Sequence, residues 1–335
     1  MEHIREAAAF LEGRVRRTPV EASPGLSERL GAPVYLKLEN WQLTGSFKIR
    51  GALFGLHRLM LEGHTRIATC SAGNHGRGLA RAAQMLGAEA TIFVPASVDP
   101  AKLAGMQADG ATVETSPWPG FDRTEAWAKE VCRERGLPFL SAYDHVDIMA
   151  ANGGSVALEV DAQLPDGTLT CVMPVGGGGH SAGFARAMQE LRPGSQIVAA
   201  QAAASPALAQ SLEAGSAVTR LDGPGTLAHG LEGGLGAAPF EILRDAVHHV
   251  ALIDEDAIRG AMRWMAAEHQ MMIEASASVA VAACLAGDMP TVAATRGGGK
   301  PVVVFISGRN VALETFLEIV DRSGPYPEKS PSSMA

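Results

Sequence analysis

Short apolar runs alternate with helical patterns through the middle of the chain. Strands are expected at TRIATC, ATIFVP, ATVETS and PFLSAY, with helices between them at HGRGLARAAQMLG, DPAKLAGMQADG and FDRTEAWAKEVCRERG. The runs CVMPV, QIVAA and PVVVFI continue the series of strands. Strands that are apolar along their whole length are typical of parallel sheets covered by helices on both faces. The pattern therefore predicts an α/β fold, doubly wound, with mainly parallel sheets.

One lysine stands between glycines in the stretch TGSFKIRGA. The preceding VYLKLENWQLTG is expected to form a strand and a loop, and a helix is expected to begin near Ser46 as its N-cap. On that helix Lys48 shares a face with Gly51, Ala52 and Gly55, whose lack of bulk would let a large group approach. A lysine in a first turn opposes the helix dipole. The position favours either a lysine with a chemical role or one that extends to solvent.

Four glycines follow the expected strand CVMPV in VGGGGHSAG, where a helix begins. Bare N–H groups at a helix N-terminus favour an anion such as phosphate. No Lys-Ser/Thr pair follows, so the run is not a nucleoside-triphosphate P-loop. Gly177, Gly179 and Ala182 fit a loose dinucleotide fingerprint, but the next strand ends at Gln201 instead of an acidic residue. That difference weakens the alternative of a nicotinamide-dependent oxidoreductase.

A third motif, SAGNHG, also lies between an expected strand and an expected helix. Ser71, Asn74 and the loop amides could hold a carboxylate, although Ser and Asn are also common helix caps and turn residues. Taken together, the three motifs require a ligand with a phosphate, a carbonyl for a lysine and a partner that carries a carboxylate. Pyridoxal phosphate with an amino acid meets all three requirements.

Composition limits the class of protein. The 335 residues are enough for about two domains, and 28 Lys+Arg against 36 Asp+Glu give a formal net charge of -8. This charge offers no electrostatic basis for binding nucleic acid or an anionic membrane. No apolar run reaches the ~18 residues of a membrane span. The four cysteines form no metal-type pair and no signal peptide is evident, so a cytoplasmic location is expected.

The chain resembles the serine/threonine dehydratase family of pyridoxal-phosphate enzymes, which have the tryptophan synthase β-like fold (fold type II). The resemblance runs from RTPVEAS at residue 17 to ISGRN at residue 310, through KLENWQLTGSFKIRGA, SAGNHG, PVGGGGHSAG, GTLAHGLEGG and IEASA in family order. It implies a dehydratase (ammonia-lyase) that removes the β-hydroxyl of a 3-hydroxy amino acid such as threonine or serine. The products would be a 2-oxo acid and ammonia.

The resemblance also implies roles for individual residues. Lys48 would hold the cofactor as a Schiff base and, once displaced by the substrate, remove the Cα proton. The other cofactor-binding positions that it implies are Phe47, Asn74, Gly176, Gly177, Gly178, Gly179, Gly230, Glu274 and Ser307. The substrate-binding positions that it implies are Ser71, Ala72, Gly73, Asn74 and His75.

Two of these positions bear on the type of reaction. The hydroxyl of Ser307 would face the pyridine nitrogen and suit an unprotonated ring, which favours prompt loss of the β-substituent; a serine in a turn after a strand is the plainer alternative. In serine racemase, a member of the same group, a serine just before Gly-Asn returns the proton to Cα. Ala72 stands at that position, so little racemisation is expected.

The resemblance implies a domain division as well. Residues 1–51 and 145–324 would form a large cofactor-binding domain, and residues 52–144 a small mobile domain that closes on it. Family members are commonly homodimers, so a homodimer is expected. Residues 325–335, rich in proline and serine, are expected to be disordered.

Three departures from the family pattern involve four positions. His229 replaces an aspartate of many relatives and could touch a substrate side chain or fill a gap. Arg309 adds a charge that could meet an acidic substrate group or point to solvent. Gln201 and Ala207 stand where cation-binding relatives carry an acidic pair, and calcium and magnesium depend on charged oxygen ligands. No divalent metal is therefore expected.

Several alternatives stay open. The substrate could be a specialised compound such as 3-phenylserine, 3-hydroxyaspartate or hydroxyectoine, and serine racemase activity is less favoured. A nicotinamide oxidoreductase and a non-catalytic amino-acid sensor are the other classes. A sensor would be expected to lack the lysine or the glycine loop, and both are present.

Overall fold

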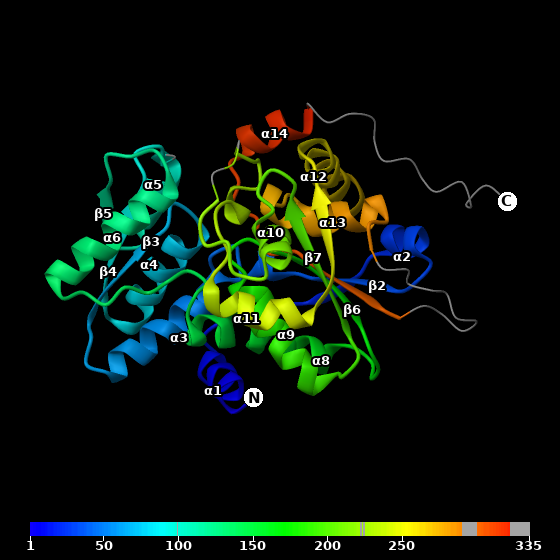
Figure 1. The fold of residues 1–335 in the computed structure, drawn as a ribbon, viewed down its shortest axis with the longest axis horizontal. Helices are drawn as coiled ribbons and strands as arrows, with labels where there is room; N and C mark the ends of the chain where they lie inside the picture. The colour runs from blue at the N-terminus through cyan, green and yellow to red at the C-terminus, as the bar shows by residue number, and fades with distance from the viewer. Residues whose placement is uncertain (99, 222, 224, 290–299, 322–335) are drawn as a thin grey trace.

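Two mainly parallel sheets organise the protein (Figure 1). The computed structural model describes residues 1–98, 100–221, 223, 225–289 and 300–321. The larger sheet has the strand order β1-β2-β9-β6-β7-β8, antiparallel only between β1 and β2, and the smaller has the order β3-β4-β5. The strands are β1 Val20–Ala22, β2 Val34–Lys37, β3 Arg66–Cys70, β4 Glu89–Val94, β5 Thr112–Thr115, β6 Thr170–Pro174, β7 Gln196–Ala202, β8 Val247–Ile253 and β9 Val302–Phe305.

Helices cover both faces of the larger sheet. In Figure 1, α8, α9 and α11 lie on one side of it and α12 and α13 on the other, while α4, α5 and α6 pack against the smaller sheet. The helices are α1 Glu2–Leu11, α2 Pro24–Leu30, α3 Lys48–Leu61, α4 Asn74–Leu86, α5 Pro100–Ala108, α6 Phe121–Arg135, α7 Val146–Met149, α8 Ser155–Gln163, α9 Gly179–Leu191, α10 Ala207–Ala214, α11 Ala237–Ala246, α12 Glu255–His269, α13 Ala275–Ala286 and α14 Leu313–Asp321, with 3₁₀ turns η1 Glu39–Trp41 and η3 His229–Leu231 and a π-helical turn η2 Ala150–Gly154.

Strand β6 shows why the strands are apolar throughout. Cys171 and Met173 point into one hydrophobic cluster, and Val172 between them points into a second cluster on the opposite face. Successive residues of a strand face opposite sides, so a strand covered on both sides needs apolar residues at every position. The predicted α/β, doubly wound fold with mainly parallel sheets is confirmed.

The domain division stays a prediction. The smaller sheet and its helices α4, α5 and α6 all lie within residues 52–144. Helix α3 crosses the expected boundary at residue 52 and packs both on α4 and on α7 and η2. Residues 325–335, the expected disordered tail, lie outside the described residues.

One strand prediction was wrong and two strands were not predicted. PFLSAY forms only a single bridge, between Ala68 and Phe139, and then turns. The hydroxyl oxygen of Ser141 accepts the N–H groups of Tyr143 and Asp144, a local turn that competes with a sheet ladder. Strands β1 and β8 were missed because they lie at the edges of the larger sheet, where most of their residues are only partly buried or exposed.

The predicted N-cap of α3 was wrong by one residue. The helix begins at Lys48 with Phe47 as the N-cap residue, and no side chain caps it. Ser46 instead pairs through its backbone with Gly308, and its buried hydroxyl has no hydrogen-bond partner within the described chain. The pairing holds this segment in an extended conformation, which delays the first helical turn.

The small-residue face of α3 is used for packing against protein. The N–H of Gly51 donates to the Asn152 side-chain oxygen at 2.8 Å, and a Cβ at residue 51 would lie 2.7 Å from that amide. A Cβ at Gly55 would lie 3.0 Å from Leu140. The expectation that a bulky ligand approaches along this face is therefore corrected: η2 and Leu140 occupy it.

A buried ionic network ties α3 to the larger sheet and to α8. Arg50 donates to both carboxylate oxygens of Glu39 at 2.8 Å and to Glu159 at 2.7 Å. Lys37 donates to the other oxygen of Glu159 at 2.6 Å, and Thr18 donates to Glu39 at 2.6 Å. Burial disfavours each of these charges, but two cations facing two anions offset that cost. The network anchors α3 at Arg50, which lies two residues after Lys48 in the sequence.

Replacement of Arg50 by methionine should strongly destabilise the protein, because Glu39 would be left buried and without its partner. The expected loss is about 3–5 kcal/mol in the free energy of unfolding, measured by urea titration. Arg58→Met on the same helix is the matched control, because Arg58 is 37% exposed and pairs with the half-exposed Glu6. Arg58 also lies 3.9 Å from Asp147, which keeps His3 as a partner at 2.7 Å. The expected cost of Arg58→Met is below about 1 kcal/mol. Equal losses in the two variants would contradict the role assigned to the network.

Candidate active site

The motifs singled out in the sequence meet at the carboxyl ends of neighbouring strands. The glycine loop follows β6 and Ser307 follows β9, and these strands are paired in parallel. The segment 44–47 runs beside 307–310, with the N–H of Phe47 donating to the Ser307 carbonyl at 3.3 Å. Ligands of open α/β sheets bind at this edge. The fold therefore brings the lysine segment, the glycine loop and Ser307 to one place.

Lys48 lies at the start of α3 and is partly buried. Its Nζ donates to the carbonyl oxygen of Ala142 at 3.0 Å and lies 5.2 Å from the centre of the Phe47 ring. Burial lowers the pKa of the Lys48 amine to about 8, although the nearby Glu274 carboxylate acts to raise it. A larger fraction of this amine is therefore neutral, and nucleophilic, near neutral pH than for an ordinary lysine.

The glycine loop leaves room only for backbone. Gly178 has φ +86°, which side chains rarely adopt, and it precedes the first turn of α9. A Cβ at Gly176 would lie 2.8 Å from the Cα of Leu231, and one at Gly177 would overlap the ring of Tyr143. The bare amides at the N-terminus of a 13-residue helix suit an anion. Gly230 lies beside the glycine loop, because its carbonyl oxygen would be 3.0 Å from a Cβ at Gly176.

A polar network joins Asn74 of α4 to the end of the larger sheet. The amide nitrogen of Asn74 donates to Glu274 at 2.8 Å, and its oxygen accepts from Asn310 at 2.6 Å. The backbone N–H of Asn310 donates to the second carboxylate oxygen of Glu274 at 3.0 Å. Burial raises the pKa of the Glu274 carboxyl to about 7, against these hydrogen bonds. Asn74 keeps one N–H and one lone pair for a ligand.

The SAGNHG loop forms the N-terminus of α4. The N–H of Gly73 donates to the Ser71 hydroxyl at 3.2 Å, and α4 begins at Asn74, while Ala72 is half-buried between them. His75 is buried, and neither ring nitrogen has a hydrogen-bond partner among the described residues. Burial and then the Lys48 charge lower the pKa of His75 to about 3, so its ring is neutral.

A second neutral imidazole, not predicted as a site residue, lies behind Phe47. His180 directly follows the glycine loop and stacks on the Phe47 ring with centroids 4.3 Å apart. Burial lowers the pKa of His180 to about 3, and both ring nitrogens lack a partner among the described residues. The sequence signal was the histidine within VGGGGHSAG, where a helix N-terminus disfavours a cation.

The residues that depart from the family pattern do not line the enclosed part of the site. His229 is largely exposed and lies 3.7 Å from Glu232, and Arg309 is also exposed. Gln201 is buried, and both ends of its amide bind the backbone: the nitrogen donates to Val175 and the oxygen accepts from Ala209. Across the described ranges we find neither a group of three metal-ligating side chains nor a helix long and apolar enough to cross a bilayer.

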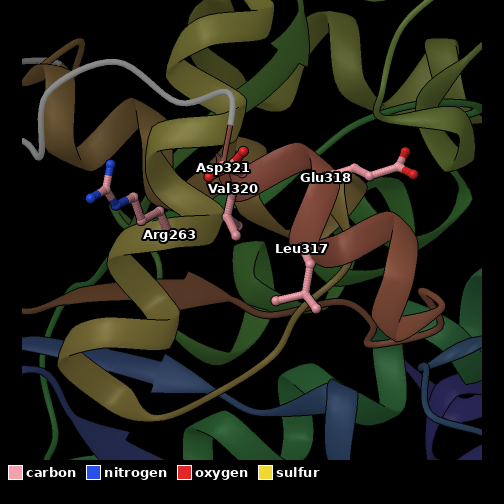
Figure 2. Close-up of a pocket in the computed structure, with 5 residues that line it drawn as sticks. All are labelled: Arg263, Leu317, Glu318, Val320 and Asp321. Atoms are coloured by element: carbon pink, nitrogen blue, oxygen red, sulfur yellow. The ribbon is translucent and has the colours of Figure 1, made fainter.

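A surface groove of about 580 Å³ lies elsewhere, between α12 and α14. Figure 2 shows its lining, in which the charged ends of Arg263 and Glu318 point away from each other. Leu317 and Val320 supply apolar walls. No converging polar groups and no nucleophile are seen among these residues, so this groove is not a candidate for catalysis.

Comparisons with known proteins agree with this geometry. A family model described as pyridoxal-phosphate dependent enzyme matches residues 11–308. The chain is 36% identical over 321 residues to the L-threonine ammonia-lyase of Geobacter sulfurreducens, a match that covers 95% of this chain and 77% of that protein.

Solved structures of the same type superpose closely. Maize serine racemase matches with a TM-score of 0.86 at 29% identity, over 95% of each chain. The processed form of threonine deaminase isoform 2 from Solanum lycopersicum matches with a TM-score of 0.85 at 26% identity, over 97% of this chain and 93% of that one. The residues matched by the family model include Lys48, the glycine loop and Ser307.

The Lys48 amine should react as a base with a pKa near 8. Acylation of the cofactor-free protein at a series of pH values, followed by peptide mass spectrometry, should give a midpoint near pH 8 for Lys48, against ~10.4 for an ordinary lysine. Lys129, half-exposed on α6, is an internal comparison in the same digest. A Lys48 midpoint near pH 10 would show that its amine is charged and solvated.

Proposed function

The chain belongs to the family of pyridoxal-phosphate-dependent enzymes, and we propose that it removes the β-hydroxyl of a 3-hydroxy amino acid to release a 2-oxo acid and ammonia. The observation that carries the proposal is the partly buried Lys48 amine, with its lowered pKa, at the same sheet edge as a four-glycine helix N-terminus. The naming of relatives as L-threonine ammonia-lyases supports this reaction class.

The residues present fit pyridoxal phosphate. The amides of Gly176, Gly177, Gly178 and Gly179 would hold the phosphate at the N-terminus of α9, where no side chain has room. When bound, the cofactor supplies an aldehyde that forms a Schiff base with an amine, and a ring that withdraws electrons from the substrate Cα. We propose Lys48 as its attachment point.

Other side chains would hold the ring. Phe47, backed by His180, would pack beside it, and Gly230 would leave room on the loop after Ala228. The spare N–H of Asn74 would reach the ring hydroxyl, and the Ser307 hydroxyl would face the ring nitrogen. Glu274 orients Asn74 through their 2.8 Å hydrogen bond.

Lys48 would then act as the base. Once the substrate amine has replaced it, its neutral Nζ can take the proton from the substrate Cα, and the lowered pKa keeps that form available. The amides and hydroxyl of the SAGNHG loop, at the N-terminus of α4, would hold the substrate carboxylate. The β-hydroxyl leaves as water, and the released enamine takes up water to give the 2-oxo acid and ammonia.

The finer properties are also proposals. We propose a cytoplasmic homodimer whose small domain, residues 52–144, closes over the substrate. The four cysteines are free and buried, which accords with a reducing compartment. We propose that no divalent metal is required. Gln201 stands at an expected metal-ligand position, but both ends of its amide are hydrogen-bonded to the backbone. Threonine or serine is the proposed substrate, with specialised 3-hydroxy amino acids as alternatives.

Lys48→Ala should abolish turnover. The purified native protein, supplied with pyridoxal phosphate, should release 2-oxo acid and ammonia from at least one member of a panel of 3-hydroxy amino acids. Borohydride should fix the cofactor to the peptide that contains residue 48 in the native protein only. Normal labelling or turnover in the variant would refute the assignment, and a native protein inactive on the whole panel would refute the proposed reaction.

Racemisation should be slow compared with elimination. Returning a proton to Cα from the face opposite Lys48 needs a group with an exchangeable proton, and Ala72 supplies only a methyl. A positioned general acid is typically worth ~10²–10⁴-fold, so its absence should dominate the rate. Chiral analysis of residual substrate during turnover measures this. Accumulation of the inverted isomer as fast as the 2-oxo acid would show that another group reaches that face.

A further inference from the structure

Four consecutive residues connect the lysine to the glycine loop. This bridging segment, residues 141–144, follows the single bridge at Phe139 and precedes α7. The carbonyl of Ala142 accepts the hydrogen bond from Lys48 at 3.0 Å. The next residue, Tyr143, places its ring against Gly177 and its backbone against Gly179, so closely that a Cβ at either glycine would overlap it. Lys48 and the glycine loop are thus linked through the adjacent residues Ala142 and Tyr143.

The bridging segment is held at both ends. At its start the Ser141 hydroxyl accepts the N–H groups of Tyr143 and Asp144, at 3.4 and 3.1 Å. At its end the Asp144 carboxylate accepts from the N–H groups of Ala237 and Ala238, at 3.3 and 3.0 Å, in the first turn of α11. A carboxylate at a helix N-terminus is a favourable anchor. The hydrogen bonds of Ser141 and Asp144, on either side of Tyr143, therefore help to fix its position.

The side chain of Tyr143 has a free polar end. Its hydroxyl makes no hydrogen bond to any described residue, although the residue is only partly exposed. Burial and the charges of Glu125 and Asp122 raise the pKa of the phenol, so it stays protonated. No hydrogen bond of the hydroxyl to a described residue therefore holds the ring in place, and the contacts that position Tyr143 are those of its ring and backbone.

We propose that Tyr143 is a positioning residue of this enzyme: its ring forms the wall of the phosphate cradle over Gly177, and its backbone keeps the Ala142 carbonyl on the Lys48 amine. The inference rests on the proposed function, because it takes the glycine loop to be the phosphate site. On this proposal, residues 141–144, which follow the smaller sheet, form one side of the phosphate site. The same four residues contact both the glycine loop and the Lys48 amine.

The primary test compares two variants of Tyr143 in apo-protein. Pyridoxal phosphate is titrated into each protein and binding is followed by absorbance. Tyr143→Ala, which removes the wall, should weaken binding at least tenfold, whereas Tyr143→Phe, which keeps the ring, should stay within about threefold of the native protein. The Lys48 labelling midpoint should also rise toward the ordinary value near pH 10 in Tyr143→Ala, because water reaches the amine. A structural role alone would not shift that midpoint.

A double-mutant cycle keeps the inference testable if one variant is unstable. Gly177→Ala should impair cofactor binding through overlap with the Tyr143 ring, and adding Tyr143→Ala should restore part of it. Gly260→Ala on α12, where an added Cβ meets nothing within 4 Å, is the matched control and should leave binding unchanged.

The outcomes separate the two proposals. Native protein that binds no pyridoxal phosphate would overturn the proposed function. Native protein that binds it, with Tyr143→Ala binding equally well and an unchanged Lys48 midpoint, would overturn the role of Tyr143 alone. Additive effects of Gly177→Ala and Tyr143→Ala would likewise overturn the contact, while weakened binding with rescue in the cycle supports it.

Discussion

The position of Lys48 depends on a buried ion pair two residues along the chain. Arg50 and Glu39 are almost wholly buried, and their paired hydrogen bonds lock the loop after β2 to the first turn of α3. Glu159 extends the pair into α8 and accepts from Lys37 in β2. Removing four charges from water is costly, and the geometry must satisfy them all to be tolerated. That requirement leaves the lysine segment little freedom to shift relative to the sheet.

Close backbone packing also restricts how α3 can move relative to the helix that follows the glycine loop, α9. A Cβ at Gly78 of α4 would lie 3.3 Å from the Lys48 backbone, so α3 and α4 are nearly in backbone contact. Gly153 of the π-helical turn η2 faces His180 and Phe184 in α9 just as closely. π-helical turns often mark functional sites, where an extra residue widens the backbone to fit a neighbour. Here η2 packs on both α3, which carries Lys48, and α9, which follows the glycine loop.

Sequence reasoning found the elements whose cause is local. Apolar runs such as CVMPV predicted the buried parallel strands, and the four glycines predicted a bare helix N-terminus after β6. It failed at Ser46, which looks like an N-cap, because pairing with the distant Gly308 holds it extended. It also failed at PFLSAY, where an apolar run typical of a strand hid the local turn that Ser141 makes. The contacts made by residues 141–144 have no local signature, because they depend on where the smaller sheet meets the larger.

Burial brings the site's ionisable side chains toward their neutral forms. It lowers the pKa of Lys48 to about 8 and those of His75 and His180 to about 3, and it raises that of Glu274 to about 7. A protonated imidazole beside Lys48 would repel a proton from the lysine, so two neutral rings leave that amine free to accept one. A half-protonated Glu274 likewise adds less negative charge, which would otherwise hold the lysine in its cationic form. Burial leaves the ring nitrogens of His75 and His180 without hydrogen-bond partners among the described residues. The same burial lowers the pKa of Lys48, so that its amine could act as a base near neutral pH.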